Sequence, residues 1–228
     1  MKKLYPLLCV LFVIYWSCQE EQEVDTTPTE VTLWGEVYSV EDTTELDLGH
    51  NGLTGSIPSE IGNLTNLTKL ILEGNQLSGS IPPEIWNMTN LTYLDLSGNN
   101  NDLSNGLSGS IPPEIWNMTN LISLNLSDNQ LTGYIYSEIG NLTNLTELRL
   151  DYNQLTGSIP SEIVNLTNLE WLTLNNNQLT DTIPNKICNF DINWSSSTYF
   201  RIFNNQLCPP YPSCIEDYVG EQDTSDCP

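Results

Sequence analysis

Basic residues are scarce in this chain of 228 residues. Six Lys and Arg stand against 29 Asp and Glu, with one histidine, and the formal net charge is -23. Lys2 and Lys3 precede Cys18, so a form that begins at Cys18 has four basic and 29 acidic residues, a charge of -25. Nucleic acids and anionic lipid surfaces are bound through clusters of Lys and Arg. The composition therefore predicts neither nucleic acid nor an electrostatically bound membrane surface as a partner.

Catalytic and metal-binding motifs are also lacking. The sequence contains no GxSxG, HExxH, phosphate-loop or EF-hand pattern. His50 is the only histidine, and no serine or cysteine nucleophile pattern accompanies it. The sequence therefore predicts a protein that is not an enzyme and that uses no cofactor or metal.

Long apolar runs are limited to Leu4–Trp16, whose 13 residues are too few to cross a bilayer as a helix. Such a run after two lysines is typical of a secretion signal. The Ser-Cys junction before an acidic stretch resembles a bacterial lipoprotein signal, and the acidic stretch resembles the surface-export signal of Bacteroidetes lipoproteins. The resemblance implies a signal peptide over 1–17, lipidation of Cys18, an acidic tether over 18–30 and an outer-membrane or surface location. An ordinary secretory signal is the alternative.

A repeat dominates the rest of the chain. Successive coils align on seven asparagines, at Asn51, Asn75, Asn99, Asn129, Asn153, Asn177 and Asn205. The stretch LTELRLDYNQLTGSIPSEIVNLTN, residues 145–168, shows the pattern most clearly. Leucine pairs such as Leu148 and Leu150 have the period of a strand, so both face one side. We expect the asparagine amides to bond the backbone of neighbouring coils.

This pattern resembles the plant-type class of the leucine-rich repeat family, over about residues 43–207. The resemblance implies an α/β-type solenoid with little regular helix. Short parallel strands form its concave face, and 3₁₀ turns or loops form its convex face. Glycine recurs at a bend that needs positive φ, and Asp181 takes its place in the sixth coil.

The ends of a solenoid need caps. We expect an N-terminal cap over 31–42, six repeats over 43–189, and a degenerate seventh repeat with a C-terminal cap over 190–228. Four cysteines lie in or near this last segment, and their spacing fits disulfides better than zinc: Cys188, Cys208, Cys214 and Cys227. Three pairings are possible. The short separations favour Cys188–Cys208 and Cys214–Cys227.

The segment LSGSIPPEIWNMTNL occurs twice, at 77–91 and 107–121, which indicates an internal duplication. It places Trp86 and Trp116 at matching convex positions, where we expect them to stack on one another. Six extra residues near Asn100–Asn105 are expected to loop out of the third coil.

Outward strand positions indicate where a partner binds. Towards the C-terminus they bring together basic and aromatic side chains on the concave face, namely Arg149, Tyr152, Trp171, Tyr199, Arg201 and Phe203. Tyr, Trp and Arg dominate binding hot spots. The alternative is that these aromatics shield the cap or stack on one another.

The sequence thus favours a non-enzymatic recognition module that binds a protein or glycan on its concave face. A structural or adhesive role in the cell envelope is the first alternative. An ice- or carbohydrate-binding solenoid is the second, and it is suggested by outward threonines at Thr44, Thr68, Thr92 and Thr146.

Overall fold

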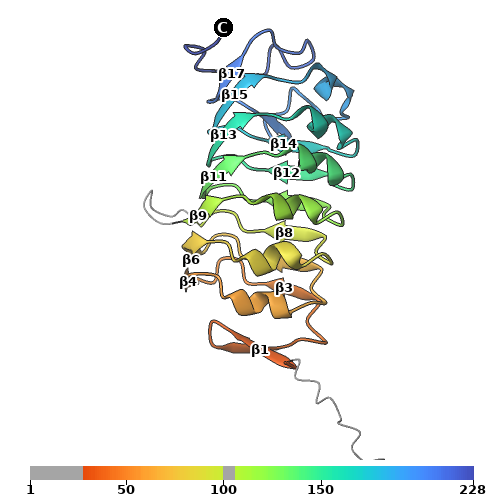
Figure 1. Cartoon of the computed structure of the whole chain (residues 1–228). Helices are drawn as coiled ribbons and strands as arrows, with labels where there is room; N and C mark the ends of the chain where they lie inside the picture. The colour runs from red at the N-terminus through yellow and green to blue at the C-terminus, as the bar shows by residue number, and fades with distance from the viewer. Residues whose placement is uncertain (1–27, 100–105) are drawn as a thin grey trace, which may run out of the picture.

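The computed structural model describes residues 28–99 and 106–228. The lipidation site predicted at Cys18, the signal peptide and the insertion at Asn100–Asn105 lie outside these residues. Within them the chain winds into stacked coils, and the N-terminal hairpin and the C-terminus lie at opposite ends of the stack (Figure 1). The hairpin pairs β1 (Glu30–Leu33) with β2 (Glu36–Ser39).

One parallel sheet runs the length of the stack in the order β16-β14-β12-β10-β8-β5-β3. Each coil contributes one short strand to it. The strands are β3 (Glu45–Asp47), β5 (Lys69–Ile71), β8 (Tyr93–Asp95), β10 (Ser123–Asn125), β12 (Glu147–Arg149), β14 (Trp171–Thr173) and β16 (Phe200–Arg201). We call the outward surface of this sheet the concave face, as the sequence predicted it.

A second set of strands follows the asparagine of each coil. β4 (Thr54–Gly55) pairs with β6 (Gln76–Leu77), and the order of the longer sheet is β17-β15-β13-β11-β9-β7. Its strands are β7 (Gly79–Ser80), β9 (Leu107–Ser110), β11 (Gln130–Tyr134), β13 (Gln154–Ser158), β15 (Gln178–Thr182) and β17 (Gln206–Cys208). The sequence pattern gave no indication of this second sheet.

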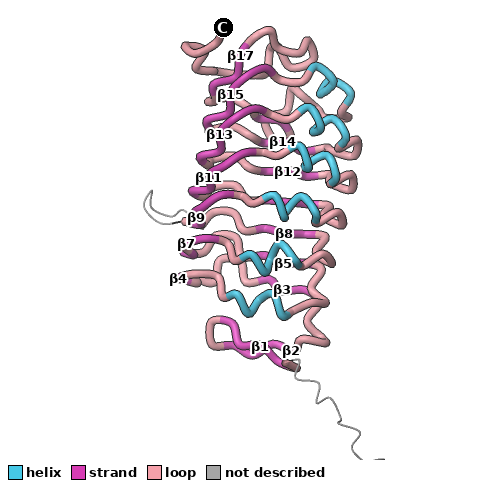
Figure 2. Tube along the Cα trace, viewed as in Figure 1, coloured by secondary structure: helices cyan, strands magenta, loops and turns pink. Residues whose placement is uncertain are grey.

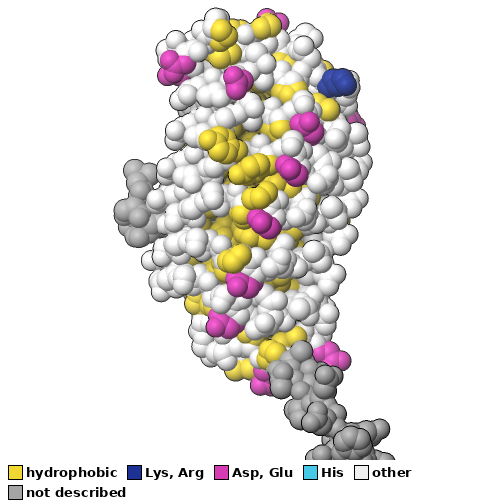
Figure 3. Space-filling model, in the orientation of Figure 1, with side chains coloured by type: hydrophobic (Ala, Val, Ile, Leu, Met, Phe, Trp, Pro, Cys, Tyr) yellow, Lys and Arg dark blue, Asp and Glu magenta, His cyan; other side chains and the backbone are white. Residues whose placement is uncertain are grey.

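Short 3₁₀ turns cover the convex face, one to a coil (Figure 2). They are η1 (Ser59–Asn63), η2 (Pro83–Asn87), η3 (Pro113–Asn117), η4 (Ser137–Asn141), η5 (Ser161–Asn165) and η6 (Asn185–Asn189). The first turn of each from η1 to η5 carries a glutamate. Acidic side chains accordingly form a line along this face of the molecule (Figure 3). The solenoid predicted from the sequence, with parallel strands and 3₁₀ turns, is confirmed.

The core is a column of leucine and isoleucine side chains. The strand residues Leu70, Leu94, Leu124, Leu148 and Leu172 are all fully buried. Since one coil cannot bury these side chains alone, stacking of neighbours creates the core.

Asparagine amides hold the coils in register. Asn153 accepts a hydrogen bond from the Leu131 backbone N–H at 2.9 Å and donates to the Leu126 carbonyl at 2.9 Å. Both partners belong to the preceding coil, and Asn99, Asn129, Asn177 and Asn205 repeat the arrangement. This ladder satisfies backbone groups that water cannot reach, as the sequence predicted.

The predicted bend is also confirmed. Gly55, Gly79, Gly109, Gly133 and Gly157 all have positive φ, and Asp181 adopts φ 65° in their place. The residue before each ladder asparagine is left-handed as well, including His50, Asp128 and Tyr152. Asp and Asn tolerate this conformation better than most residues, whereas Tyr152 is held in it by the stack.

The predicted disulfide pairing is wrong. Cys188 bonds Cys214, and Cys208 bonds Cys227. Beyond β17 the chain folds back over the last coil, so that Cys214 reaches the end of η6 and the final residues return to β17. Because the cap is built by this return, closeness along the chain does not decide which sulfurs meet.

The duplicated tryptophans, placed by the sequence at matching convex positions, are not convex surface residues. Trp86 is 3% exposed and Trp116 is 0% exposed, and both belong to the core. The corresponding residue is Gly62 in the coil before them and Gly140 in the coil after them. The side chain that follows the isoleucine of each 3₁₀ turn can therefore pack inward when it is large and apolar.

Candidate functional site

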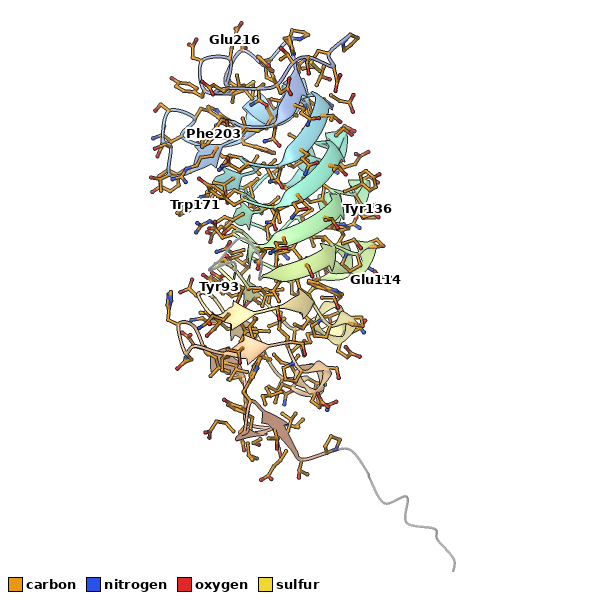
Figure 4. All side chains as sticks on the ribbon, turned by 90° about the vertical axis from the view of Figure 1, so that its left-hand side faces the viewer. Tyr93, Glu114, Tyr136, Trp171, Phe203 and Glu216 are labelled. Atoms are coloured by element: carbon orange, nitrogen blue, oxygen red, sulfur yellow. A yellow bond between two sulfur atoms is a disulfide. The ribbon has the colours of Figure 1, made fainter. Side chains whose placement is uncertain are left out.

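The concave face has the register that the sequence predicted. Ser123, Glu147 and Trp171 are neighbours across β10, β12 and β14, and Asn125, Arg149 and Thr173 form the next column. Figure 4 shows the labelled Tyr93, Trp171 and Phe203 on one side of the stack, opposite Glu114 and Tyr136. Alternation along each strand turns the column residues away from the leucine core.

Positive charge gathers on this face. Residues 28–228 contain four basic residues, and Lys69, Arg149 and Arg201 all lie on concave strands. The fourth, Lys186, lies on η6. Three of the four basic residues within 28–228 therefore lie on one sheet, in a chain of net charge -23.

The side chains of Arg149, Trp171 and Tyr199 contact one another in a row on the C-terminal half of the face. The Arg149 guanidinium lies 5.2 Å from the centre of the Trp171 ring. Trp171 and Tyr199 meet edge to face, with centroids 5.2 Å apart. Arg149 also lies 3.7 Å from the Glu147 carboxylate, which accepts a hydrogen bond from the Ser123 hydroxyl. The row is held in place before any partner arrives, which lowers the entropic cost of binding.

The other three predicted site residues have different surroundings. Tyr152 is 47% exposed and lies three residues after the end of β12. Arg201 donates through Nε to the Ser197 carbonyl. Phe203 is half-buried and packs against Gly220 of the C-terminal cap. The contact is so close that a Cβ added to Gly220 would lie only 2.5 Å from the Phe203 Cβ. The alternative explanation, that these aromatics stack on one another or shield the cap, therefore accounts for part of the geometry of the patch. We keep the term concave patch for all six residues, Arg149, Tyr152, Trp171, Tyr199, Arg201 and Phe203.

Sequence reasoning missed a second cationic–aromatic pair on the same face. Lys69 Nζ lies 5.6 Å from the centre of the Tyr93 ring. Burial, and then the charge of Asp95, raise the pKa of the Tyr93 hydroxyl above its usual range, so it stays protonated. Tyr93 occupies the same column as Trp171, and that register was the signal that could have found it.

A buried polar network supports the middle of the face. Asp95 accepts hydrogen bonds from the Ser97 hydroxyl at 2.6 Å and from the Asn125 amide at 2.9 Å. Nearer the patch, the Thr173 hydroxyl donates to Asp151 at 2.5 Å. These satisfied groups make the sheet surface rigid.

Asn175 lies next to this network and is fully buried. Neither its amide nitrogen nor its amide oxygen has a hydrogen-bond partner among the described residues. A buried amide of this kind costs stability, so it stands out against the satisfied ladder asparagines.

His50 is exposed and lies 3.5 Å from the Glu73 carboxylate. Residues 28–99 and 106–228 contain no group of three or more His, Cys, Asp or Glu side chains placed to hold a metal ion.

The outward threonines are engaged within the stack. Thr68 donates its hydroxyl to the Thr44 carbonyl, Thr92 to the Thr68 carbonyl, and Thr146 to the Ile122 carbonyl, at 3.0 to 3.1 Å. Their protons are therefore not free for an ice or sugar surface.

With this geometry established, comparison with known proteins gives the family. Sequence profiles described as leucine rich repeat match residues 41–100 and four further segments, 90–118, 120–142, 144–166 and 168–190. The chain belongs to the leucine-rich repeat family. Among curated protein sequences, none matches the chain.

Several solved structures of leucine-rich repeat ectodomains are similar to the chain. The ectodomain of the Arabidopsis thaliana receptor kinase GASSHO1/SCHENGEN3, solved with CASPARIAN STRIP INTEGRITY FACTOR 2, is 38% identical with a TM-score of 0.66, over 77% of this chain and 20% of that one. The Arabidopsis receptor kinase HAESA, solved with the peptide hormone IDA and the co-receptor SERK1, is 35% identical with a TM-score of 0.62, over 72% and 26%.

A shorter relative is covered more fully. Pollen Receptor Kinase 3 is 27% identical with a TM-score of 0.58, over 79% of this chain and 80% of that one. The chain thus spans about a fifth and about a quarter of the two longer ectodomains. Among the residues that the structure describes, no helix has the length and apolar character needed to span a membrane.

Proposed function

We propose that this protein is an exported, non-enzymatic recognition module that binds an extended peptide or protein segment on its concave patch. The observation that carries the proposal is the row of contacting side chains formed by Arg149 on β12, Trp171 on β14 and Tyr199 just before β16. Aromatic rings supply apolar contact area, and the guanidinium supplies directed donors.

The comparisons support a peptide over the glycan that the sequence left open. Two of the similar ectodomains were solved with a peptide hormone or an integrity factor bound. An acidic surface repels most acidic proteins, whereas the three concave cations would attract a carboxylate or a carbonyl-rich chain locally. The patch would therefore select partners that place a carboxylate or a carbonyl opposite these cations, whatever the net charge of the partner.

The direct test is a selection of displayed random peptides on the purified protein. Selected peptides should bind Trp171→Ala and Arg149→Ala at least about tenfold more weakly, as expected when a hot-spot side chain is removed. Peptides that bind wild type and both variants equally would overturn the proposal.

Tyr134→Ala is the matched control. Tyr134 ends β11, is 56% exposed, and meets Tyr136 edge to face, so it resembles the patch chemically but lies on the second sheet. Trp86→Ala is unsuitable as a convex control, because Trp86 is buried. The Tyr134 variant should bind the selected peptides as wild type does.

Export and anchoring are also part of the proposal. The two disulfides support an oxidising compartment, since such bonds persist outside the cytosol. We propose that residues 1–17 are a cleaved signal, that Cys18 carries the lipid, and that residues 18–30 tether the solenoid to a bacterial outer membrane. Cys18→Ala should then move the protein from the membrane fraction to the soluble fraction or block its processing. Unchanged processing and fractionation would contradict the anchor, though not the recognition role.

A further inference from the structure

A groove runs along the edge of the stack where each 3₁₀ turn leads into the next concave strand. Its volume is about 700 Å³, and its lining comes from five successive coils, from Asn90 at one end to Asp191 at the other. Four steps of about 4.8 Å make it about 20 Å long, which is about six residues of extended chain. None of the side chains that line the groove is basic.

The asparagines of this groove turn their amide nitrogens to the stack and leave their amide oxygens unused. Asn120, Asn144 and Asn168 donate their amide N–H to backbone carbonyls of the preceding coil, at 2.8 to 2.9 Å. A carbonyl can only accept, so the bonded atom of each amide is its nitrogen, which uses one of its two N–H groups there. The amide oxygen is left as a free acceptor. These oxygens accept no hydrogen bond from the described residues.

Two threonine hydroxyl groups in the groove are also left as acceptors. Thr92 and Thr146 both line the groove and both donate their proton to a backbone carbonyl. Their oxygens keep lone pairs and have no proton to offer.

Carboxylates end the groove. Glu170 and Asp191 are exposed at the C-terminal side, and neither has an ion-pair partner in the part of the chain that the structure describes. Ile122 is 47% exposed near the middle and offers an apolar contact. The groove thus combines acceptors, negative charge and one apolar surface.

We propose that this groove is a second binding site, and that it takes an extended, lysine- or arginine-rich peptide segment. Ammonium and guanidinium groups carry donors only, which matches a lining whose charged groups are two carboxylates and whose asparagines keep unused amide oxygens. Aliphatic stems of such side chains would cover Ile122. This site is separate from the concave patch, whose charge has the opposite sign.

The probe is a fluorescently labelled octalysine peptide, titrated against the protein at about 0.1 M salt, where distant charges are screened. The test variant is Glu170→Gln with Asp191→Asn. The matched control is Glu84→Gln with Glu114→Gln, which removes the same charge from exposed positions on the convex face. The test variant should weaken binding at least about tenfold and the control less than about twofold.

A second variant, Ile122→Lys, places a cation in the groove at an exposed position and should also abolish binding. Equal weakening by the test and control pairs would show general attraction to an acidic protein and overturn the proposal. Failure of wild type to bind octalysine, or competition by neutral maltohexaose, would overturn it too. Trp171→Ala should leave octalysine binding unchanged, so this result and that of the concave patch are independent.

Discussion

At the scale of single residues, the buried asparagines differ in whether their side chains make hydrogen bonds. Asn177 accepts from the Leu155 N–H at 2.9 Å and donates to the Leu150 carbonyl at 3.0 Å, which locks it between coils. The side chain of Asn175, two residues earlier, is buried and has no hydrogen-bond partner among the described residues. The same residue type thus stabilises the stack at one position and costs stability at the other.

Replacement by leucine should reveal this contrast. Asn177→Leu should lower the free energy of unfolding by at least about 2 kcal/mol, because each buried backbone group left unpaired costs about 1–3 kcal/mol. Asn175→Leu, of similar volume, should change it by less than about 1 kcal/mol or raise it. Urea unfolding of the two variants measures both. Equal losses would show that Asn175 has a partner in solution.

Asp128 provides a prediction for pH dependence. Burial, and then the charge of Asp151, raise the pKa of the Asp128 carboxyl, while Arg149 opposes the shift. A raised pKa means that the folded protein disfavours the ionised form, so the charge costs stability above that pKa and costs nothing when both states are protonated.

Asp128→Asn should therefore raise the melting temperature at about pH 7 and leave it unchanged at about pH 3. Asparagine tolerates the left-handed backbone of this position, φ 54°, so the comparison isolates the charge. Thermal scans at the two pH values check the prediction, and a lower melting temperature at neutral pH would contradict it.

At the scale of elements, the repeat made most of the fold predictable. One asparagine and two leucines recur in each coil, which fixes the concave register and therefore the neighbours of Arg149 and Trp171. The burial of the duplicated tryptophans was not predictable in the same way, because their position varies among glycine, valine and cysteine in other coils and so gives no consistent apolar signal. The second sheet was missed since its strands alternate small polar residues with a single leucine.

Trp116 should act as a core residue. Trp116→Ala should lower the free energy of unfolding by about 3–5 kcal/mol, because it removes a fully buried indole and leaves a cavity. Ser161→Ala, at the exposed start of η5, is the surface comparison and should stay within about 0.5 kcal/mol. Chemical denaturation measures both, and a Trp116 variant as stable as wild type would show that this indole is outside the core.

The C-terminal cap could not be predicted in detail, since its shape depends on a return of the chain that follows no repeat. Tyr211 donates its hydroxyl to the Leu207 carbonyl, and Gln222 donates to the Ile202 carbonyl, which closes the last coil. The two disulfides fasten this return at both ends.

Removal of the Cys208–Cys227 bond by a double serine substitution should cost about 2–5 kcal/mol. Since each coil depends on its neighbour, the loss should first expose the amides of β17 and β15 to hydrogen exchange and leave β5 and β8 protected. Peptide mapping of unreduced protein checks the pairing itself. Detection of a Cys188–Cys208 bond would contradict the structure.

At the scale of the whole molecule, acidic side chains occur on every described face and the basic ones gather on one. Glutamates line the convex face, and amide oxygens and carboxylates line the edge groove. The concave sheet carries three cations among carboxylates such as those of Glu45, Asp47 and Glu147. A rigid stack presents these surfaces in fixed relation to one another, which suits recognition rather than catalysis. The aromatic row was predictable from the register of the strands alone. The groove could be recognised only from the structure, because its chemistry depends on which side-chain donors bond to neighbouring coils.

Hydroxyl-radical footprinting with a selected peptide tests the central claim most directly, because exposed tyrosines report from different faces. Bound peptide should protect Tyr152, Trp171 and Tyr199 from oxidation. Tyr134, Tyr136 and Tyr218, which are also exposed, should be oxidised as in the free protein. Protection confined to Tyr134 and Tyr136, with Trp171 unchanged, would contradict the account and move the recognition surface to the second sheet.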